Sequence, residues 1–128
     1  MEIIRAIPKD SKGNDYPDKK ERNLIFFKVR YNRHRDLCED TSRDVCDKEE
    51  WAECQAVLCL PDNYGKTGEK TQLIIACHGA GSTVCEESLQ TGGLAGVLSC
   101  VDAGYAALDI DGADPSGLTM GCRSEAHV

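Results

Sequence analysis

Residues 72–82 read QLIIACHGAGS. The five residues after Gln72 are apolar, which is typical of a strand covered on both faces in a parallel sheet. Gly79 and Gly81 then favour a tight turn, because residues without a Cβ let backbone N–H groups point outward. The stretch therefore predicts a central, buried strand over 72–77 that runs into a glycine-rich loop at its carboxyl end.

The residues that follow predict a helix and a further strand. Leu94, Val97, Leu98 and Val101 recur at i, i+3, i+4 and i+7, the spacing of one apolar stripe on a helix, which we expect to end at Gly104. The run YAALDI, residues 105–110, is a short strand pattern. Strand, helix and strand make a βαβ unit, which is almost always right-handed with parallel strands.

The first half of the chain predicts strands of a different kind. β-Branched and aromatic residues or polar–apolar alternation indicate strands over 2–7, 24–31 and 53–60, with a long polar loop over 8–22 and a short helix over 47–53 capped by Asp47. We expect an α/β fold, a mixed sheet in which antiparallel N-terminal strands extend the parallel βαβ unit. One domain spans 1–128, with N-terminal strands and polar loops in 1–52 and the strand, glycine-rich loop and βαβ unit in 53–128.

Composition and charge narrow the class of protein. The chain has 128 residues, of which 41% are hydrophobic and 29% charged, and a formal net charge of -7. Such a charge repels phosphate backbones, so we expect no nucleic-acid partner, and we interpret the basic residues of 28–35 as a solvated strand face. Since the sequence contains neither a run of about 18 apolar residues nor a signal-peptide core, we expect no membrane association and a cytoplasmic location.

Eight cysteines raise the question of disulfides or metal. They stand at 38, 46, 54, 59, 77, 85, 100 and 122, without the Cys-x-x-Cys pairs that structural zinc sites usually contain. We therefore expect no metal and no cofactor. Cys59, Cys77 and Cys100 lie within apolar stretches and are predicted to be small buried hydrophobes.

The HGAGS loop is the candidate site for chemistry. Two backbone N–H donors at the carboxyl end of a parallel strand form a small anion site, and Ala80 and Gly81 are the candidate donors. His78 precedes the turn, where its ring is placed to hydrogen-bond across the base of the loop. The alternative is an ordinary strand-to-helix connection. Val84 stands where a dinucleotide fingerprint needs its third glycine, and the Gly-Lys-Ser/Thr of a phosphate loop is absent.

A family resemblance joins these features. The run LCLPDNYGKTGEKTQLIIACHGAGS, together with the later GYAALDIDG, resembles the front half of α/β-hydrolase esterases and related serine peptidases, over about residues 53–112. The resemblance implies that the amides of Ala80 and Gly81 form an oxyanion hole and that His78 and Gly79 shape the loop.

The same resemblance implies an incomplete enzyme. The family's nucleophile lies in a G-x-S-x-G elbow, a pattern that none of the serines matches. We therefore expect the N-terminal portion of a serine hydrolase that is inactive alone and acts on a small acyl ester or a peptide only when a downstream segment completes it. In the family the third strand lies between the fourth and the fifth, so Leu73 to Cys77 would form an open apolar edge that favours a homo-oligomer.

Three alternatives remain. The half-sheet could serve as a non-catalytic interaction or assembly module, and the cysteines could build a redox or metal protein. Asp109, Asp111 and Asp114 with Gly112 loosely resemble a calcium loop but lack its distant glutamate, so an Asp-rich turn after a strand is the simpler interpretation.

Overall fold

The computed structural model describes residues 2–32, 51–79 and 81–111. In chain order the elements are β1 (Ile4–Ala6), β2 (Arg22–Asn32), β3 (Trp51–Leu60), β4 (Leu73–Ala76), β5 (Val84–Cys85), β6 (Gln90–Thr91), the 3-10 helix η2 (Leu94–Gly96), α2 (Leu98–Asp102) and β7 (Ala106–Ile110). Strands predominate among the described residues, and the two helical elements found there lie together between β6 and β7. None of the described helices is long and apolar enough to span a membrane.

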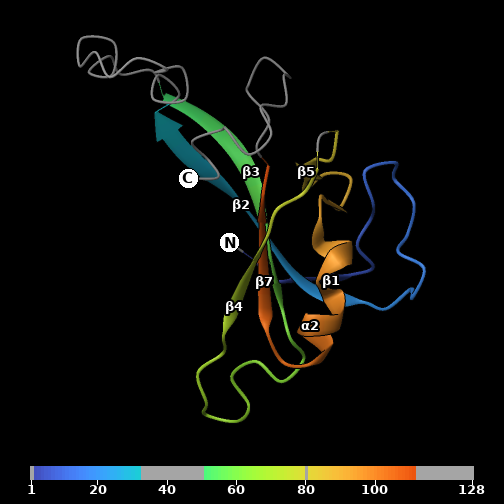
Figure 1. Ribbon diagram of the computed structural model, residues 1–128, viewed down its shortest axis with the longest axis vertical. Helices are drawn as coiled ribbons and strands as arrows, with labels where there is room; N and C mark the ends of the chain where they lie inside the picture. Colours follow the sequence, from blue (N-terminus) through green and yellow to red (C-terminus); the bar gives the residue numbers. More distant parts are fainter. Residues whose placement is uncertain (1, 33–50, 80, 112–128) are drawn as a thin grey trace.

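Five strands form one mixed sheet in the order β1-β2-β3-β7-β4 (Figure 1). The pairs β1/β2, β2/β3 and β3/β7 are antiparallel, and β4/β7 is parallel. The expected mixed α/β sheet, with antiparallel N-terminal strands joined to a parallel βαβ unit, is confirmed at this level. Strands from both halves of the chain share the sheet.

β2 and β3 form the long antiparallel pair of the sheet. Their register runs from Asn23 opposite Leu60 to Asn32 opposite Trp51. The predicted helix over 47–53 is wrong in its described part, because 51–53 belong to β3; residues 47–50 lie outside the described residues. Pairing with β2 outweighs the weak local helix signal there.

The connection from β6 to β7 carries the predicted apolar stripe. Leu94, Leu98 and Val101 are buried, and Val97 packs against the same cluster. The predicted continuous helix is instead a 3-10 turn followed by α2, with the change at Val97. Gly96, a poor helix former, immediately precedes this break.

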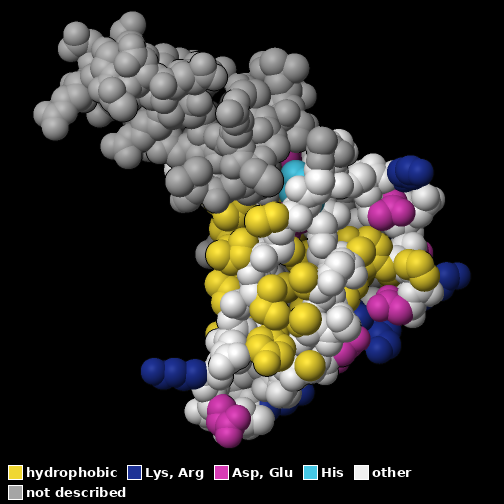
Figure 2. Space-filling view, in the orientation of Figure 1, with side chains coloured by type: hydrophobic (Ala, Val, Ile, Leu, Met, Phe, Trp, Pro, Cys, Tyr) yellow, Lys and Arg dark blue, Asp and Glu magenta, His cyan; other side chains and the backbone are white. Residues whose placement is uncertain are grey.

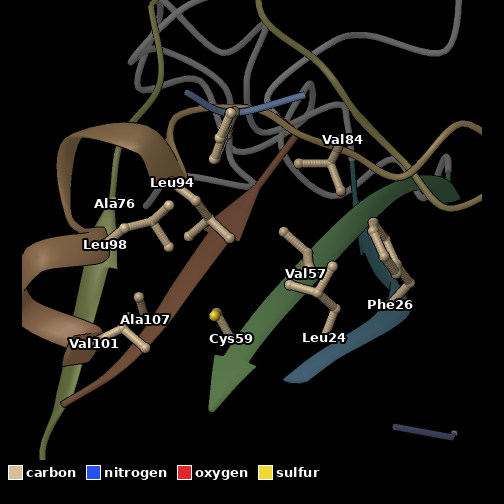
Figure 3. Packing of buried hydrophobic residues seen from close by; sticks show 11 residues of the cluster. Leu24, Phe26, Val57, Cys59, Ala76, Val84, Leu94, Leu98, Val101 and Ala107 are labelled. Atoms are coloured by element: carbon tan, nitrogen blue, oxygen red, sulfur yellow. The ribbon is translucent and has the colours of Figure 1, made fainter. Parts of the chain in front are cut away.

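One face of the sheet carries the hydrophobic core (Figure 3). Side chains alternate along each strand, and the register places Leu24 beside Cys59 and Phe26 beside Val57 on this face. The helical segment covers these residues, as Figure 3 shows for Leu94, Leu98 and Val101. Cys59 is fully buried, as predicted.

The predicted coverage of β4 on both faces is wrong. β4 is an edge strand, and the side chains of Leu73 and Ile75 are 53% and 63% exposed. Cys77, predicted to be buried, is exposed just beyond the strand, and Cys100 is half-buried. The edge position that the family order implied for this strand is what the described sheet contains.

A hairpin that the sequence pattern did not indicate follows the glycine-rich loop. β5 and β6 pair over two residues each, closed by Leu89 with a φ of +57°. The predicted polar loop is attached to this hairpin, because Lys9 N–H donates to the Leu89 carbonyl at 2.9 Å and Thr91 N–H donates to the Lys9 carbonyl at 3.1 Å. Tyr16, buried in the core, lies with its hydroxyl 2.6 Å from Thr91 Oγ1.

Candidate functional site

The HGAGS loop leaves the sheet at the carboxyl end of β4, beside the carboxyl end of β7. Ser82 N–H donates to the Gly79 carbonyl at 3.3 Å, which closes a four-residue turn. Gly81, third in that turn, has a φ of +86°, the left-handed value that a type II turn requires at this position. A Cβ at Gly79 or Gly81 would meet no atom within 4 Å, so the requirement for glycine at 81 is conformational.

The structure describes one of the two predicted amide donors. Ala80 lies outside the described residues. Gly81 is exposed, and no hydrogen bond from its N–H to a described residue is present. Ser82 N–H, by contrast, is used within the turn. Gly81, the one described residue of the predicted pair, is therefore exposed just beyond the end of a parallel strand.

His78 lies beneath the loop with its side chain 1% exposed. Its Nδ1 is 2.9 Å from the Gly79 carbonyl, which accepts the hydrogen bond, and its Nε2 is 3.8 Å from Asp111 Oδ1. The ring thus connects the start of the loop with the end of β7.

Asp111 also holds the far end of the loop. Thr83 Oγ1 donates to Asp111 Oδ2 at 2.9 Å, and Asp111 N–H donates to the Gln55 carbonyl of β3 at 2.8 Å. One carboxylate therefore faces His78 on one side of the turn and Thr83 on the other. The far end of the loop is therefore hydrogen-bonded to a residue that is itself fixed to the sheet, and His78 at the near end lies 3.8 Å from the same carboxylate.

A second buried carboxylate lies beside the glycine pair that packs against His78. Asp109 is 0% exposed and accepts a hydrogen bond from Gly93 N–H. A Cβ on Gly93 would lie 2.9 Å from the Cα and Cβ of His78, and one on Gly92 would lie 2.2 Å from Asp109 Oδ2. The glycine pair lets the segment before η2 pass directly against His78.

Sequence reasoning did not assign Thr83, Gly92 and Gly93 to the site, and it interpreted Asp109 and Asp111 only as part of a turn. Part of this arrangement could have been predicted from the order of the strands. Carboxyl ends of neighbouring parallel strands meet at one edge of a sheet, so residues after β4 and residues ending β7 lie together. The contacts of Gly92 and Gly93 depend on tertiary packing that no local pattern indicates.

A surface pocket of about 270 Å³ lies elsewhere. It lies at the end of the sheet opposite the HGAGS loop. Its lining comes from the start of β2, the end of β3 with the turn after it, and the end of α2 with the turn before β7: Arg22, Leu60, Pro61, Asp62, Asn63, Val101, Asp102, Ala103 and Gly104. Arg22, 6% exposed, donates there to Asp102 at 2.5 Å and to Asp18 at 2.8 Å. This internal ion pairing gives the pocket a structural role in joining β2 to α2.

Among the described residues, no group of three or more His, Cys, Asp or Glu side chains is placed to hold a metal ion. Asp109 and Asp111 of the calcium-loop pattern contact protein groups, whereas Gly112 and Asp114 lie outside the described residues. Comparisons of the chain with protein-family models, with curated proteins and with solved structures found no match.

Proposed function

We propose that this chain is the portion of an α/β-hydrolase-type serine hydrolase that carries the oxyanion hole, and that it is inactive alone. The observation that carries the proposal is the position of the turn. An exposed glycine with a φ of +86° follows the parallel strand β4, at the end of the sheet where α/β folds bind ligands. The amides of Ala80 and Gly81 are the donors, and His78 and Gly79 shape the loop.

The strand order supports the same proposal. β4 and β7 correspond to the third and fourth strands of the resemblance, they are adjacent and parallel, and β3 joins them antiparallel. The braced loop adds a physical reason. An oxyanion hole stabilises charge effectively only when its donors are fixed before reaction, and Asp111 and His78 fix both ends of this loop.

The substrate class is a carboxylic ester or a peptide bond. Both reactions develop negative charge on a carbonyl oxygen, which two backbone donors stabilise. The sequence contains no G-x-S-x-G, so the nucleophile, its base and its acid come from a completing segment. The acyl pocket, and with it the choice between ester and peptide, comes from that segment as well.

The test compares residues 1–128 with the product of the same reading frame extended beyond Val128. The extended product should hydrolyse 4-nitrophenyl acetate and be labelled by a fluorophosphonate on a serine beyond residue 128, whereas the 1–128 chain should match a heat-treated control. In the extended product, Gly81→Ala should lower kcat by about 10² to 10³, because a Cβ is strained at this φ and displaces the donor.

Gly96→Ala is the matched control. Gly96 lies outside the loop and has neither a positive φ nor an atom within 4 Å of an added Cβ, so kcat should change by less than about threefold. Probe-sensitive turnover by the 1–128 chain, or an extended product without a reactive serine, would overturn the proposal. Equal losses in the two glycine variants would remove the assignment of Gly81.

A second candidate is a non-catalytic interaction module that uses the half-sheet as a platform. The observation that favours it is the exposed apolar side chains of β4, Leu73 and Ile75. A defined complex formed by the 1–128 chain, with no hydrolase activity in the extended product, would favour this candidate over the enzyme.

A further inference from the structure

The face of the sheet opposite the core is also apolar. One row crosses four strands without interruption: Ile25 of β2, Leu58 of β3, Leu108 of β7 and Ile75 of β4 are register neighbours. The side chains of this face, which we name the open face, are those of Ile25, Phe27, Val29, Cys54, Ala56, Leu58, Leu60, Leu73, Ile75, Ala106, Leu108 and Ile110. In the described part of the chain, η2 and α2 both pack on the other face.

On β2, β3, β7 and β4 the open face carries no charged side chain, and its row through Leu60 continues to Asn23 of β2 and Arg5 of β1. Its most exposed side chains, Leu73 and Ile75, are at the β4 edge. Ile25, Leu58 and Leu108 are half-buried, and the smaller or more enclosed side chains of this face are buried: Cys54, Ala56, Leu60 and Ala106. Figure 2 shows hydrophobic side chains gathered in the middle of the molecule, over the position of β4 and β7 in Figure 1. Partly exposed apolar surface that continues over several strands is characteristic of interaction sites.

The exposed groups at β4 point in two directions. The Gln72 carbonyl accepts from Ala106 N–H at 2.9 Å, so the backbone of Gln72 faces β7. Alternation along the strand then directs the backbone N–H and C=O of Leu73 and Ile75 away from β7, and their side chains onto the open face. A strand paired at the edge would satisfy the backbone and leave these side chains uncovered, whereas a layer over the open face would bury them.

Area favours the face over the edge as the contact. Four strands spaced by about 4.8 Å, with about five residues each at about 3.4 Å per residue, give a projected area of roughly 300 to 350 Å² per copy. Because accessible area exceeds projected area, two such faces approach the roughly 1,000 Å² that a specific interface needs. Edge pairing over the four residues of β4 would bury much less.

We propose that two copies of this chain pack open face to open face. An apolar surface is complementary to itself, and a two-fold contact uses the same patch on both copies, so the assembly closes at two. Two sheets packed in this way lie about 10 Å apart with interdigitating side chains. The proposal is independent of the hydrolase assignment, and it places the expected homo-oligomer contact on the face of the sheet.

The test is sedimentation equilibrium of the purified 1–128 chain from about 1 to 200 µM. A dimer with a Kd on the order of 1 to 100 µM is expected for an interface of this size. The affinity should rise with NaCl, because salt screens the repulsion between two copies that each carry a net charge of -7. Ile75→Lys should weaken the dimer at least tenfold, since the new charge enters the interface twice.

Two variants separate the face from other contacts. Tyr64, 54% exposed in the turn after β3, is the matched control, and Tyr64→Lys should leave Kd unchanged. Ile75→Pro removes an edge N–H but keeps an apolar side chain, so it should change Kd by less than about fivefold. Far-UV circular dichroism and thermal melts establish that each variant is folded.

Four results would overturn the proposal. They are a monomer at every concentration, a dimer indifferent to Ile75→Lys, a dimer lost with Ile75→Pro but kept with Ile75→Lys, and an open series of higher oligomers. The third result would assign the contact to the β4 edge, and the fourth would mark nonspecific association. Because no readout involves hydrolysis, failure here is distinguishable from failure of the proposed function.

Discussion

Nε2 of His78 and Oδ1 of Asp111 lie 3.8 Å apart, joining the end of β4 to the end of β7 beneath the HGAGS turn. The two residues are 33 positions apart in the chain and meet because parallel neighbours end at the same edge of the sheet. Asp111 also accepts from Thr83, so the geometry of the turn depends on residues outside HGAGS.

The brace on the far end of the loop can be tested at Thr83. Thr83→Val keeps the shape of the side chain but removes the donor to Asp111, so the free energy of unfolding should fall by about 1 to 2 kcal/mol. Urea unfolding at pH 7 measures the change. Thr83→Ser retains the hydroxyl and is the control, and equal losses in the two variants would show that the hydrogen bond is not the cause.

Gly93 should be far less tolerant of substitution than a glycine three residues away. A Cβ at Gly93 would lie 2.9 Å from His78 backbone and side-chain atoms, so Gly93→Ala should cost about 1 to 3 kcal/mol of stability. At Gly96 an added Cβ meets nothing within 4 Å and φ is not positive, so Gly96→Ala should be neutral or slightly stabilising. Thermal melts measure the shift in Tm of each variant, and similar shifts in the two would contradict the close approach of Gly93 to His78.

The strands and the mixed sheet could be predicted because their signals are local. Composition indicates β2, β3 and β7, and the spacing of Leu94, Leu98 and Val101 indicates which face of the helical segment is buried. The β5–β6 hairpin could not be predicted, since two-residue strands carry almost no periodicity and the hairpin is attached through Lys9, far away in sequence.

The site was predictable only in outline. HGAGS indicates a turn after a strand, and Gly81 has the φ that only glycine adopts readily. The brace through Asp111 and the contact of Gly93 with His78 depend on how separate segments pack. For Cys77 the sequence pattern predicted the wrong environment. An apolar run indicates burial, but Cys77 is exposed because β4 is an edge strand, which only the sheet order reveals.

Acid should destabilise the fold partly through the ion pairs of Arg22. The hydrogen bond from Arg22 holds the pKa of Asp102 below its ordinary value. The pKa of Asp18 is lowered first by the backbone hydrogen bond from Lys20 and then by Arg22. A carboxyl whose folded pKa is depressed stabilises the fold above its unfolded pKa of about 3.9, and that contribution is lost as pH falls through the folded value.

The urea midpoint should therefore fall as pH drops below about 4, from the unfolded pKa toward the lower folded values. Asp102→Asn should lower the midpoint at pH 7 and flatten this acid limb. The control is Asp62→Asn, which removes the partner of Arg5 in a pair exposed on both sides. Its effect at pH 7 should be smaller, since exposed ion pairs contribute little. An unchanged acid limb in Asp102→Asn would contradict the role given to Arg22.

Thiol reactivity should separate the cysteines by their environment. Burial raises the pKa of Cys59 and Cys54 to about 11, so at pH 7.5 very little of either is the reactive thiolate, and both side chains are shielded. Cys77 is exposed and should react first with N-ethylmaleimide in a dilute sample, where self-association is minimal.

Peptide mapping by mass spectrometry at timed intervals measures the order of labelling. Cys77 should be modified at least about tenfold faster than Cys59, and the difference should vanish in 8 M urea, where both thiols are exposed. Fast labelling of Cys59 in the native protein would contradict its position in the core between β2 and α2. Slow labelling of Cys77 at low concentration would contradict the exposed end of β4, on which the open-face contact also depends.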